Sequence, residues 1–285
     1  MANSADVIGV PTHFADHDIE AMVNALRGRT VAILTGAGVS TDSGIPDYRG
    51  ADSKPQKPMT FQQFLSGPDH RKRYWAGSHL GWRRFDAAQP NGGHQAITRL
   101  EARGLVTGTI TQNVDGLHQR AGSLRVIDLH GTLDRVLCLA CSQTFSRADI
   151  AERLTSQNPW LDELDARDLG PDGDVAVEAL DSFVTPECSV CGGILKPDIV
   201  FFGEFVPVEK FAEARALLQS ADALLIAGSS LVVNSGIRLL DQAAKRRVPI
   251  VIINRGATRG DQRATVKVEG GASELLTILA ERLTA

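Results

Sequence analysis

Four polar side chains follow the ends of two predicted β-strands, 105–110 and 124–129. They are Gln112, Asn113, Asp115 and His130. Ligands of an open parallel sheet bind at the carboxyl ends of its strands, so we expect these side chains to share one sheet edge. An imidazole with its ordinary pKa of about 6.5 can exchange protons near neutral pH. Each side chain alone could cap a turn or lie hydrogen-bonded in the core, but together they indicate a ligand-binding or catalytic site.

A glycine-rich turn follows a third predicted strand, 30–34, and residues 35–49 read TGAGVSTDSGIPDYR. Gly36 and Gly38 lack the Cβ atoms that would keep a phosphate away, so backbone amides there could face a pyrophosphate. The spacing G-x-G-x5-G through Gly44 differs from the dinucleotide fingerprint, and no acidic residue ends a second strand about 20 residues later. The turn favours a nucleotide site over a simple strand-closing turn, and it disfavours a hydride-transferring dehydrogenase.

Four cysteines form two C-x-x-C pairs that predict a structural zinc site. The pairs are Cys138 with Cys141 and Cys188 with Cys191. Four thiolates suit tetrahedral zinc and leave no open position for water, so this metal would support the fold rather than the chemistry. Two disulfides are the alternative, but nothing indicates the secretion that would favour them.

The insert between the cysteine pairs, 147–187, is acidic. It carries eleven Asp or Glu residues against three Arg, a net charge of −8, so a whole-chain charge of −4 leaves +4 elsewhere. Such a surface could attract basic protein segments. A solvated face that keeps a long loop in solution is the simpler interpretation.

The rest of the chain alternates between helical and strand patterns. Helices are expected at 18–29 and 91–103, a small helical module with aromatic anchors at 61–90, and a loop over the nucleotide at 50–60. The elements expected after residue 205 are helices 208–220, 236–247 and 272–283 and strands 223–227, 249–253 and 265–268. This alternation predicts an α/β fold, a Rossmann-like doubly wound parallel sheet with a smaller zinc-binding and helical domain inserted.

Length and charge are consistent with this organisation. We expect a Rossmann-like domain from 1–48, 91–135 and 196–285, a cofactor loop and helical module at 49–90, and a zinc-binding module with the acidic insert at 136–195.

A pI near 6.0 gives no basic surface for direct nucleic-acid binding. Without a run of 18 apolar residues no membrane span is expected, and the N-terminus does not read as a targeting peptide. A cytoplasmic monomer is favoured.

Six ordered motifs resemble those of the sirtuin (Sir2) family of NAD-dependent protein deacylases. They are the turn at 30–49, TQNVDGLH at 111–118, LHG at 129–131, PDIVFFGE at 197–204, GSSL at 228–231 and NRG at 254–256. Together they extend over most of the chain. Three further segments are similar to the class II, sirtuin-4-like branch: RYWAGSHLGW at 73–82, DRVLCLAC at 134–141 and PDGD at 171–174.

The resemblance implies a reaction in which an acyl-lysine carbonyl oxygen attacks the nicotinamide ribose of NAD, nicotinamide leaves, and the acyl group passes to ADP-ribose. His130 would be the general base that takes a proton from a ribose hydroxyl. Asn113 and Asp115 would hold the nicotinamide carboxamide and a water, and Gln112 a ribose hydroxyl. Arg49 has a planar guanidinium suited to the pyrophosphate or to holding the loop closed over it, and an exposed salt bridge is the alternative.

The resemblance also implies the residues that contact each substrate. NAD, as a co-substrate, would be bound by Gly36, Ala37, Gly38, Asp47, Tyr48, Arg49, Gln112, Asn113, Asp115, Gly228, Ser229, Ser230, Asn254, Arg255, Gly256 and Ala272. The acyl-lysine protein would be contacted by Val114, Val200, Phe201, Phe202, Gly203, Glu204, Leu231, Val232, Val233 and Asn234. The desuccinylating branch carries a Tyr and an Arg three residues apart. Here Gly77 stands three residues after Tyr74, so uncharged acyl groups are expected.

Two other functions would use the same NAD site. A mono-ADP-ribosyltransferase would pass the ribose to a protein side chain. A non-catalytic NAD or ADP-ribose sensor would use the zinc module and acidic insert as an interaction surface. The combination of His130, Asn113 and Asp115 disfavours the sensor, and a deacetylase or deacylase remains the main prediction.

Overall fold

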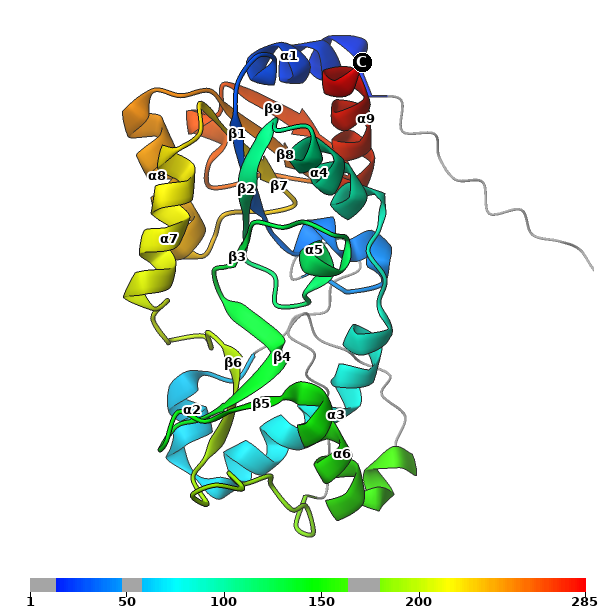
Figure 1. The fold of residues 1–285 in the computed structure, drawn as a ribbon, viewed down its shortest axis with the longest axis vertical. Helices are drawn as coiled ribbons and strands as arrows, with labels where there is room; N and C mark the ends of the chain where they lie inside the picture. The colour runs from blue at the N-terminus through cyan, green and yellow to red at the C-terminus, as the bar shows by residue number, and fades with distance from the viewer. Residues whose placement is uncertain (1–13, 48–57, 164–179) are drawn as a thin grey trace, which may run out of the picture.

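The structure is a computed structural model that describes residues 14–47, 58–163 and 180–285. Within these ranges six strands form one sheet in the order β3-β2-β1-β7-β8-β9 (Figure 1). They are β1 (Val31–Thr35), β2 (Val106–Thr111), β3 (Val126–Asp128), β7 (Ala223–Ala227), β8 (Ile250–Asn254) and β9 (Val266–Glu269). All neighbouring strands are parallel, as apolar strands buried on both faces usually are.

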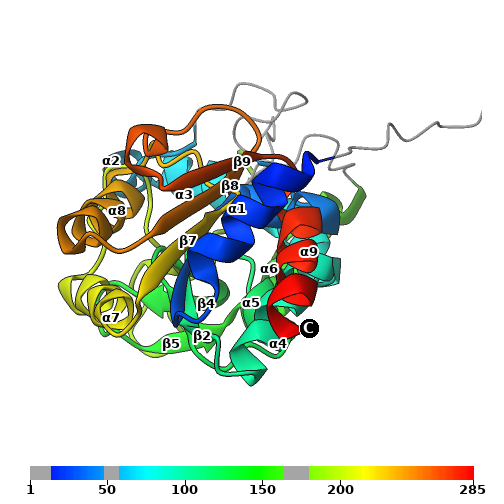
Figure 2. The same cartoon turned by 90° about the horizontal axis from the view of Figure 1, so that it is seen from above.

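Helices cover both faces of this sheet (Figure 2). One face carries α1 (Asp16–Leu26), α4 (Gly92–Ala102) and α9 (Ala272–Thr284), and the other carries α7 (Val208–Gln219) and α8 (Asn234–Arg246). Successive strand side chains point to opposite faces, so Ile33 packs in the first core and Leu34 in the second. The predicted doubly wound arrangement is confirmed. No helix in the described ranges is both long and apolar enough to cross a membrane.

The order of the strands places a switch point between β1 and β7. The first three strands extend in one direction from β1, and β7 then pairs with the other edge of β1. Ligands of such sheets bind outside the carboxyl ends of the strands at this point. Two 3-10 helices, Ala37–Val39 and Thr41–Ser43, follow β1 there.

A smaller unit lies beyond the carboxyl ends of the large sheet (Figure 1). It contains an antiparallel sheet in the order β5-β4-β6. Its elements are β4 (Gly131–Cys138), β5 (Thr144–Ser146), β6 (Leu195–Ile199), α2 (Phe61–Ser66), α3 (Pro68–Ala87), α6 (Arg147–Gln157) and a 3-10 helix, Pro159–Glu163. The remaining short helices are α5 (Leu117–Arg120) and a 3-10 helix, Asp261–Arg263. Trp75 and Phe85 of α3 share one core with Ile150 and Leu154 of α6, so the helical module and the zinc-binding module expected from the sequence meet in this core.

The first turn of α6 differs from the solvated face expected for the acidic insert. Arg147 is 1% exposed, and its guanidinium lies 5.1 Å from the ring centroid of Trp82 and 5.6 Å from that of Trp75. Its Nη2 donates to the carbonyl of Ser78 at 3.0 Å. Stacking between two indoles allows this charge to be buried, which a sequence count of surface charges does not reveal.

Candidate active site

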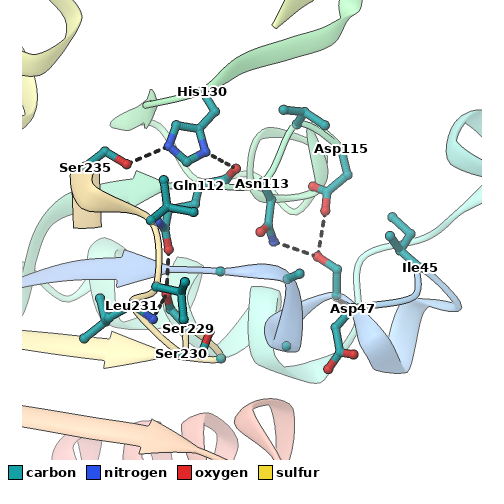
Figure 3. A pocket seen from close by; sticks show the side chains of 18 of the residues that line it. Ile45, Asp47, Gln112, Asn113, Asp115, His130, Ser229, Ser230, Leu231 and Ser235 are labelled. Carbon is teal, nitrogen blue, oxygen red and sulfur yellow. Dashed lines mark hydrogen bonds between the residues drawn. The ribbon is translucent and has the colours of Figure 1, made fainter. Parts of the chain in front are cut away.

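A cavity of about 1090 Å³ opens at the carboxyl ends of β1, β2, β7 and β8, and residues that follow β6 form another part of its wall. Figure 3 shows side chains that line it. All the NAD-binding and substrate-binding residues expected from the sequence line this cavity, except Tyr48 and Arg49, which lie outside the described residues. The fold therefore gathers residues from Gly36 to Ala272 around one space.

The glycines after β1 pack tightly against the turn after β7. A Cβ atom at Gly36 would lie 2.8 Å from the carbonyl oxygen of Gly228, and one at Gly38 would lie 2.8 Å from the Cα of Gly228. The amides of Gly36 and Gly38 donate to the carbonyls of Ala227 (3.1 Å) and Gly228 (2.9 Å). Protein carbonyls therefore already accept these two amides, and the binding of a pyrophosphate by other amides of the turn stays a prediction. The glycines allow the close approach of the two turns.

Two hydrogen bonds fix the orientation and tautomer of His130, and burial keeps it neutral. Its Nδ1 lies 3.0 Å from the backbone carbonyl of Gln112, which can only accept, so Nδ1 carries the proton. Its Nε2 then accepts from the hydroxyl of Ser235 at 2.8 Å (Figure 3). Burial lowers the pKa of His130, and the bond to Gln112 opposes this in part. The imidazole is therefore neutral near pH 7, as a general base must be.

Asp115 and Asn113 meet at the hydroxyl of Ser40. The Ser40 hydroxyl donates to Oδ2 of Asp115 at 2.7 Å and accepts from Nδ2 of Asn113 at 3.0 Å. The backbone amide of Leu117 donates to the other carboxyl oxygen at 2.9 Å. Burial raises the pKa of Asp115, while the bonds from Ser40 and Leu117 oppose the rise. This group of polar atoms can orient an amide or a water in the cavity.

Two other expected NAD ligands already have protein partners. Ser229 donates to Oε1 of Gln112 at 2.6 Å, so the Gln112 side chain is oriented by the turn after β7. Nδ2 of Asn254 donates to the carbonyls of Arg255 (2.7 Å) and Gly256 (3.1 Å). With its amide donors engaged in the turn, Asn254 would meet a ribose hydroxyl through Oδ1 as an acceptor.

The two segments expected to contact the substrate, 202–204 and 231–234, are themselves shaped by contacts and backbone geometry within the protein. Phe202 already forms an isolated β-bridge with Thr60, and the carboxylate of Glu204 pairs with Lys196 at 2.9 Å. In the other segment Leu231 adopts a φ of 57°, a strained value for a residue with a branched side chain.

Sequence reasoning missed several residues of the cavity wall. They are Ser40, Thr41, Gly44, Ile45, Pro46, Phe85, Ile199, Phe205, Val206, Phe211, Ser235, Arg238, Gly270 and Gly271. Ser40 and Ser235 contact the expected catalytic groups directly. Ser40 lies inside the motif at 30–49, and Ser235 directly follows the segment 231–234. These positions were the sequence signal that could have identified the two serines. The guanidinium of Arg238 lies 4.2 Å from the ring centroid of Phe211, a contact between α7 and α8 that no local motif indicates.

The four cysteines converge in the smaller unit, and all are free thiols. Their sulfur atoms lie within 4.8 Å of one another, with Cys138 to Cys191 at 3.5 Å and Cys141 to Cys188 at 3.8 Å. Four sulfurs bound to zinc at 2.3 Å would lie about 3.8 Å apart. The donor set therefore fits one tetrahedral zinc ion and not two disulfides.

Comparison with known proteins agrees with this geometry. The family model described as the Sir2 family matches residues 36–235. The chain belongs to the Sir2 family. A protein of Mycobacterium avium named NAD-dependent protein deacetylase 1 is 54% identical over 267 residues, which cover 92% of this sirtuin and 95% of that protein. A protein of the same name in Streptomyces coelicolor is 48% identical, covering 93% and 90%.

Solved Sir2 structures share the fold of this sirtuin. A structure described as Sir2 with a p53 peptide and NAD⁺ has a TM-score of 0.71 and 31% identity, covering 92% of this chain and 97% of that one. Sir2Tm bound to a propionylated peptide has a TM-score of 0.75 and 32% identity, with the same coverage.

Proposed function

We propose that this sirtuin is an NAD-dependent protein-lysine deacylase. It moves the acyl group of an acyl-lysine side chain to the ADP-ribose of NAD and releases nicotinamide. The observation that carries the proposal is the neutral His130, whose Nε2 faces a hydroxyl at 2.8 Å in a cavity shared with Asn113 and Asp115. The names of the bacterial relatives support the same activity.

His130, Asn113 and Asp115 have different roles in this reaction. His130 takes the proton of a ribose hydroxyl at Nε2, so that the oxygen can attack the acyl carbon once nicotinamide has left. Asn113 and Asp115, joined through Ser40, orient the carboxamide and a water. Nothing in the described part of the zinc site offers an open coordination position, because four thiolates complete a tetrahedron. Zinc there would hold β4 and the turn before β6 together.

The preferred acyl group of the substrate and the branch of the sirtuin family stay predictions. Tyr74 is buried, with ring centroids 5.4 Å from Phe64 and 5.0 Å from Phe201, and it is not among the described residues that line the cavity. This supports uncharged acyl groups, acetyl or longer. The similarity of residues 73–82 to the sirtuin-4-like branch is untested, and PDGD at 171–174 lies outside the described residues. Cytoplasmic location and a monomeric state are also predictions.

Nicotinamide release from NAD tests the proposal. The purified protein is assayed with acetyl-, longer-acyl- and succinyl-lysine peptides, with a no-peptide control and with His130→Ala. We expect peptide-dependent release, an acyl-ADP-ribose product by mass spectrometry, and loss of both in His130→Ala. ADP-ribose attached to a protein side chain would instead identify the transferase. NAD binding without release under any condition would identify the sensor.

A further inference from the structure

Lys196, on β6, carries an ammonium group that is almost completely buried beneath the cavity wall. Its side chain is 5% exposed, and Nζ donates to the carbonyl of Ile199 at 2.6 Å and pairs with Oε2 of Glu204 at 2.9 Å. The same carboxylate oxygen accepts from the backbone amide of Phe201 at 2.9 Å. One ion pair therefore closes the turn 199–204 at both ends.

Aromatic rings enclose the ion pair. Nζ of Lys196 lies 5.3 Å from the ring centroid of Phe201 and 5.4 Å from that of Phe61. An ammonium group in such surroundings is unfavourable unless a carboxylate and hydrogen bonds compensate for lost water. Glu204 supplies that carboxylate, so each partner depends on the other.

Helix α2 supports the middle of the same turn. The amide of Phe61 donates to the carbonyl of Phe202 at 2.9 Å, and Nε2 of Gln62 donates to the carbonyl of Gly203 at 3.2 Å. Gly203 has a φ of 80°, so the chain bends there in a conformation that favours glycine. The turn is held by Lys196 from β6 and by α2, and residues 199–204 all line the cavity.

We propose that Lys196 and Glu204 are positioning residues for the acyl-lysine substrate. They hold Phe201 and the neighbouring wall where the acyl-lysine side chain enters, and Glu204 acts through the turn instead of contacting the substrate. This inference rests on the deacylase function proposed above. It also differs from the expectation of a direct Glu204 contact because Lys196 and Glu204 must act as a unit.

Steady-state kinetics of Lys196→Met, Glu204→Gln and the double variant test whether the two residues act as a unit. Removal of one partner leaves the other charge buried and unpaired, so we expect the KM for an acetyl-lysine peptide to rise about tenfold. The KM for NAD should stay within about twofold, and the double variant should be no worse than the poorer single variant. Lys196→Arg should restore most of the peptide KM. Additive effects, or an unchanged peptide KM in both single variants, would overturn the proposal.

A matched control lies on the same strand, β6. Arg135 of β4 pairs with Asp198 of β6 at 2.6 Å, but this pair is exposed and neither residue lines the cavity. Exposed pairs contribute little, so Asp198→Asn should leave both KM values unchanged. A loss equal to that of Glu204→Gln would show that any charge removed from β6 disturbs the wall, which would contradict a specific role for Lys196.

Hydrogen exchange measured by mass spectrometry tests the turn without relying on activity. In the full-length protein, amides of residues 199–204 should exchange at least about tenfold faster in Lys196→Met and Glu204→Gln, and at the wild-type rate in Asp198→Asn. If exchange is unchanged in the variants and the wild type is active, the positioning role is refuted and the deacylase function still stands. If the wild type releases no nicotinamide, the deacylase function fails, and faster exchange would still support the role of the pair in the turn.

Discussion

Ser235 Oγ lies 2.8 Å from Nε2 of His130 and donates to it. The nitrogen that would take a substrate proton is thus occupied by a protein hydroxyl, and a ribose hydroxyl must replace it. We expect Ser235→Ala to change kcat by less than about threefold, whereas His130→Gln should lower kcat by about 10² or more, the usual effect of losing a general base. Peptide-dependent nicotinamide release measures both. An equal loss in the two variants would mean that Ser235 is part of the proton path.

The pH dependence of kcat/KM should report the buried state of His130. The base works only when neutral, so activity is present above its pKa and is lost as pH falls through that value. Because burial lowers this pKa below 6.5, the rate should be flat from pH 8 to pH 7 and decline only below about 6.5. A profile of kcat/KM with saturating NAD checks this. An acidic limb centred above pH 7 would contradict the neutral imidazole.

Ser40→Ala should impair NAD use more than any other single hydroxyl of the turn. Its hydroxyl is the shared partner of Asp115 and Asn113, and loss of a hydrogen bond to a buried carboxylate costs about 1.5 to 3 kcal/mol. We expect kcat/KM for NAD to fall roughly 10- to 100-fold. Ser43→Ala is the control, because Ser43 accepts from Asn91 instead. Similar losses in both would point to general damage to the turn.

Stability should decrease in acid because of a buried histidine pair. The rings of His94 and His118 lie 4.8 Å apart, both fully buried. Burial lowers the pKa of His94 to about 4 and that of His118 to about 3. Below pH 6.5 the unfolded chain takes up protons that the folded chain does not, so the free energy of unfolding falls by up to about 1.4 kcal/mol per pH unit for each histidine.

Urea denaturation at pH 7.5, 6.0 and 5.0 measures this loss. His118→Gln should reduce the dependence on pH, even if it lowers stability at pH 7.5. His17→Gln should not, because the side chain of His17 is 82% exposed. If the slope with pH is the same in all three proteins, other groups cause the acid instability.

Metal analysis should find one zinc ion per chain. Cys188→Ser removes one thiolate of the set, so it should lower zinc content and the melting temperature together, and a chelator should lower the wild-type melting temperature. Thiol titration of the denatured, metal-free protein should count four free cysteines. A metal-free wild type with two disulfides would contradict the site.

Much of the fold follows from local patterns. Alternating apolar helices and strands predicted every strand of the large sheet to within one or two residues, because hydrophobic periodicity determines those elements. The cysteine pairs predicted the metal site because the C-x-x-C spacing is also a local pattern. The pairing of β4 with β6 was not anticipated, since 131–138 mixes exposed and buried positions, and its partner follows the whole acidic insert.

The partners of the site residues were harder to predict. Serine is common in turns, and only the three-dimensional structure shows that Ser40 meets Asp115 across 75 positions and that Ser235 meets His130 across 105. Glu204 was assigned to the substrate from its motif, because the buried Lys196 eight residues earlier gives no sign in the sequence that its charge is enclosed. Long-range partners of polar groups depend on topology, which periodicity does not specify.

The position of β7 beside β1 affects the protein while it is being made. Thr30, just before β1, bonds Asp222, just before β7, across 192 positions. At about 5 to 20 residues per second, a ribosome needs roughly 10 to 40 s to synthesise that interval. During this time one edge of β1, one of the two central strands, lacks its partner β7, although all five residues of β1 are buried in the final protein. We therefore expect the nascent chain to expose this strand edge to aggregation, or to chaperones, until β7 has been synthesised.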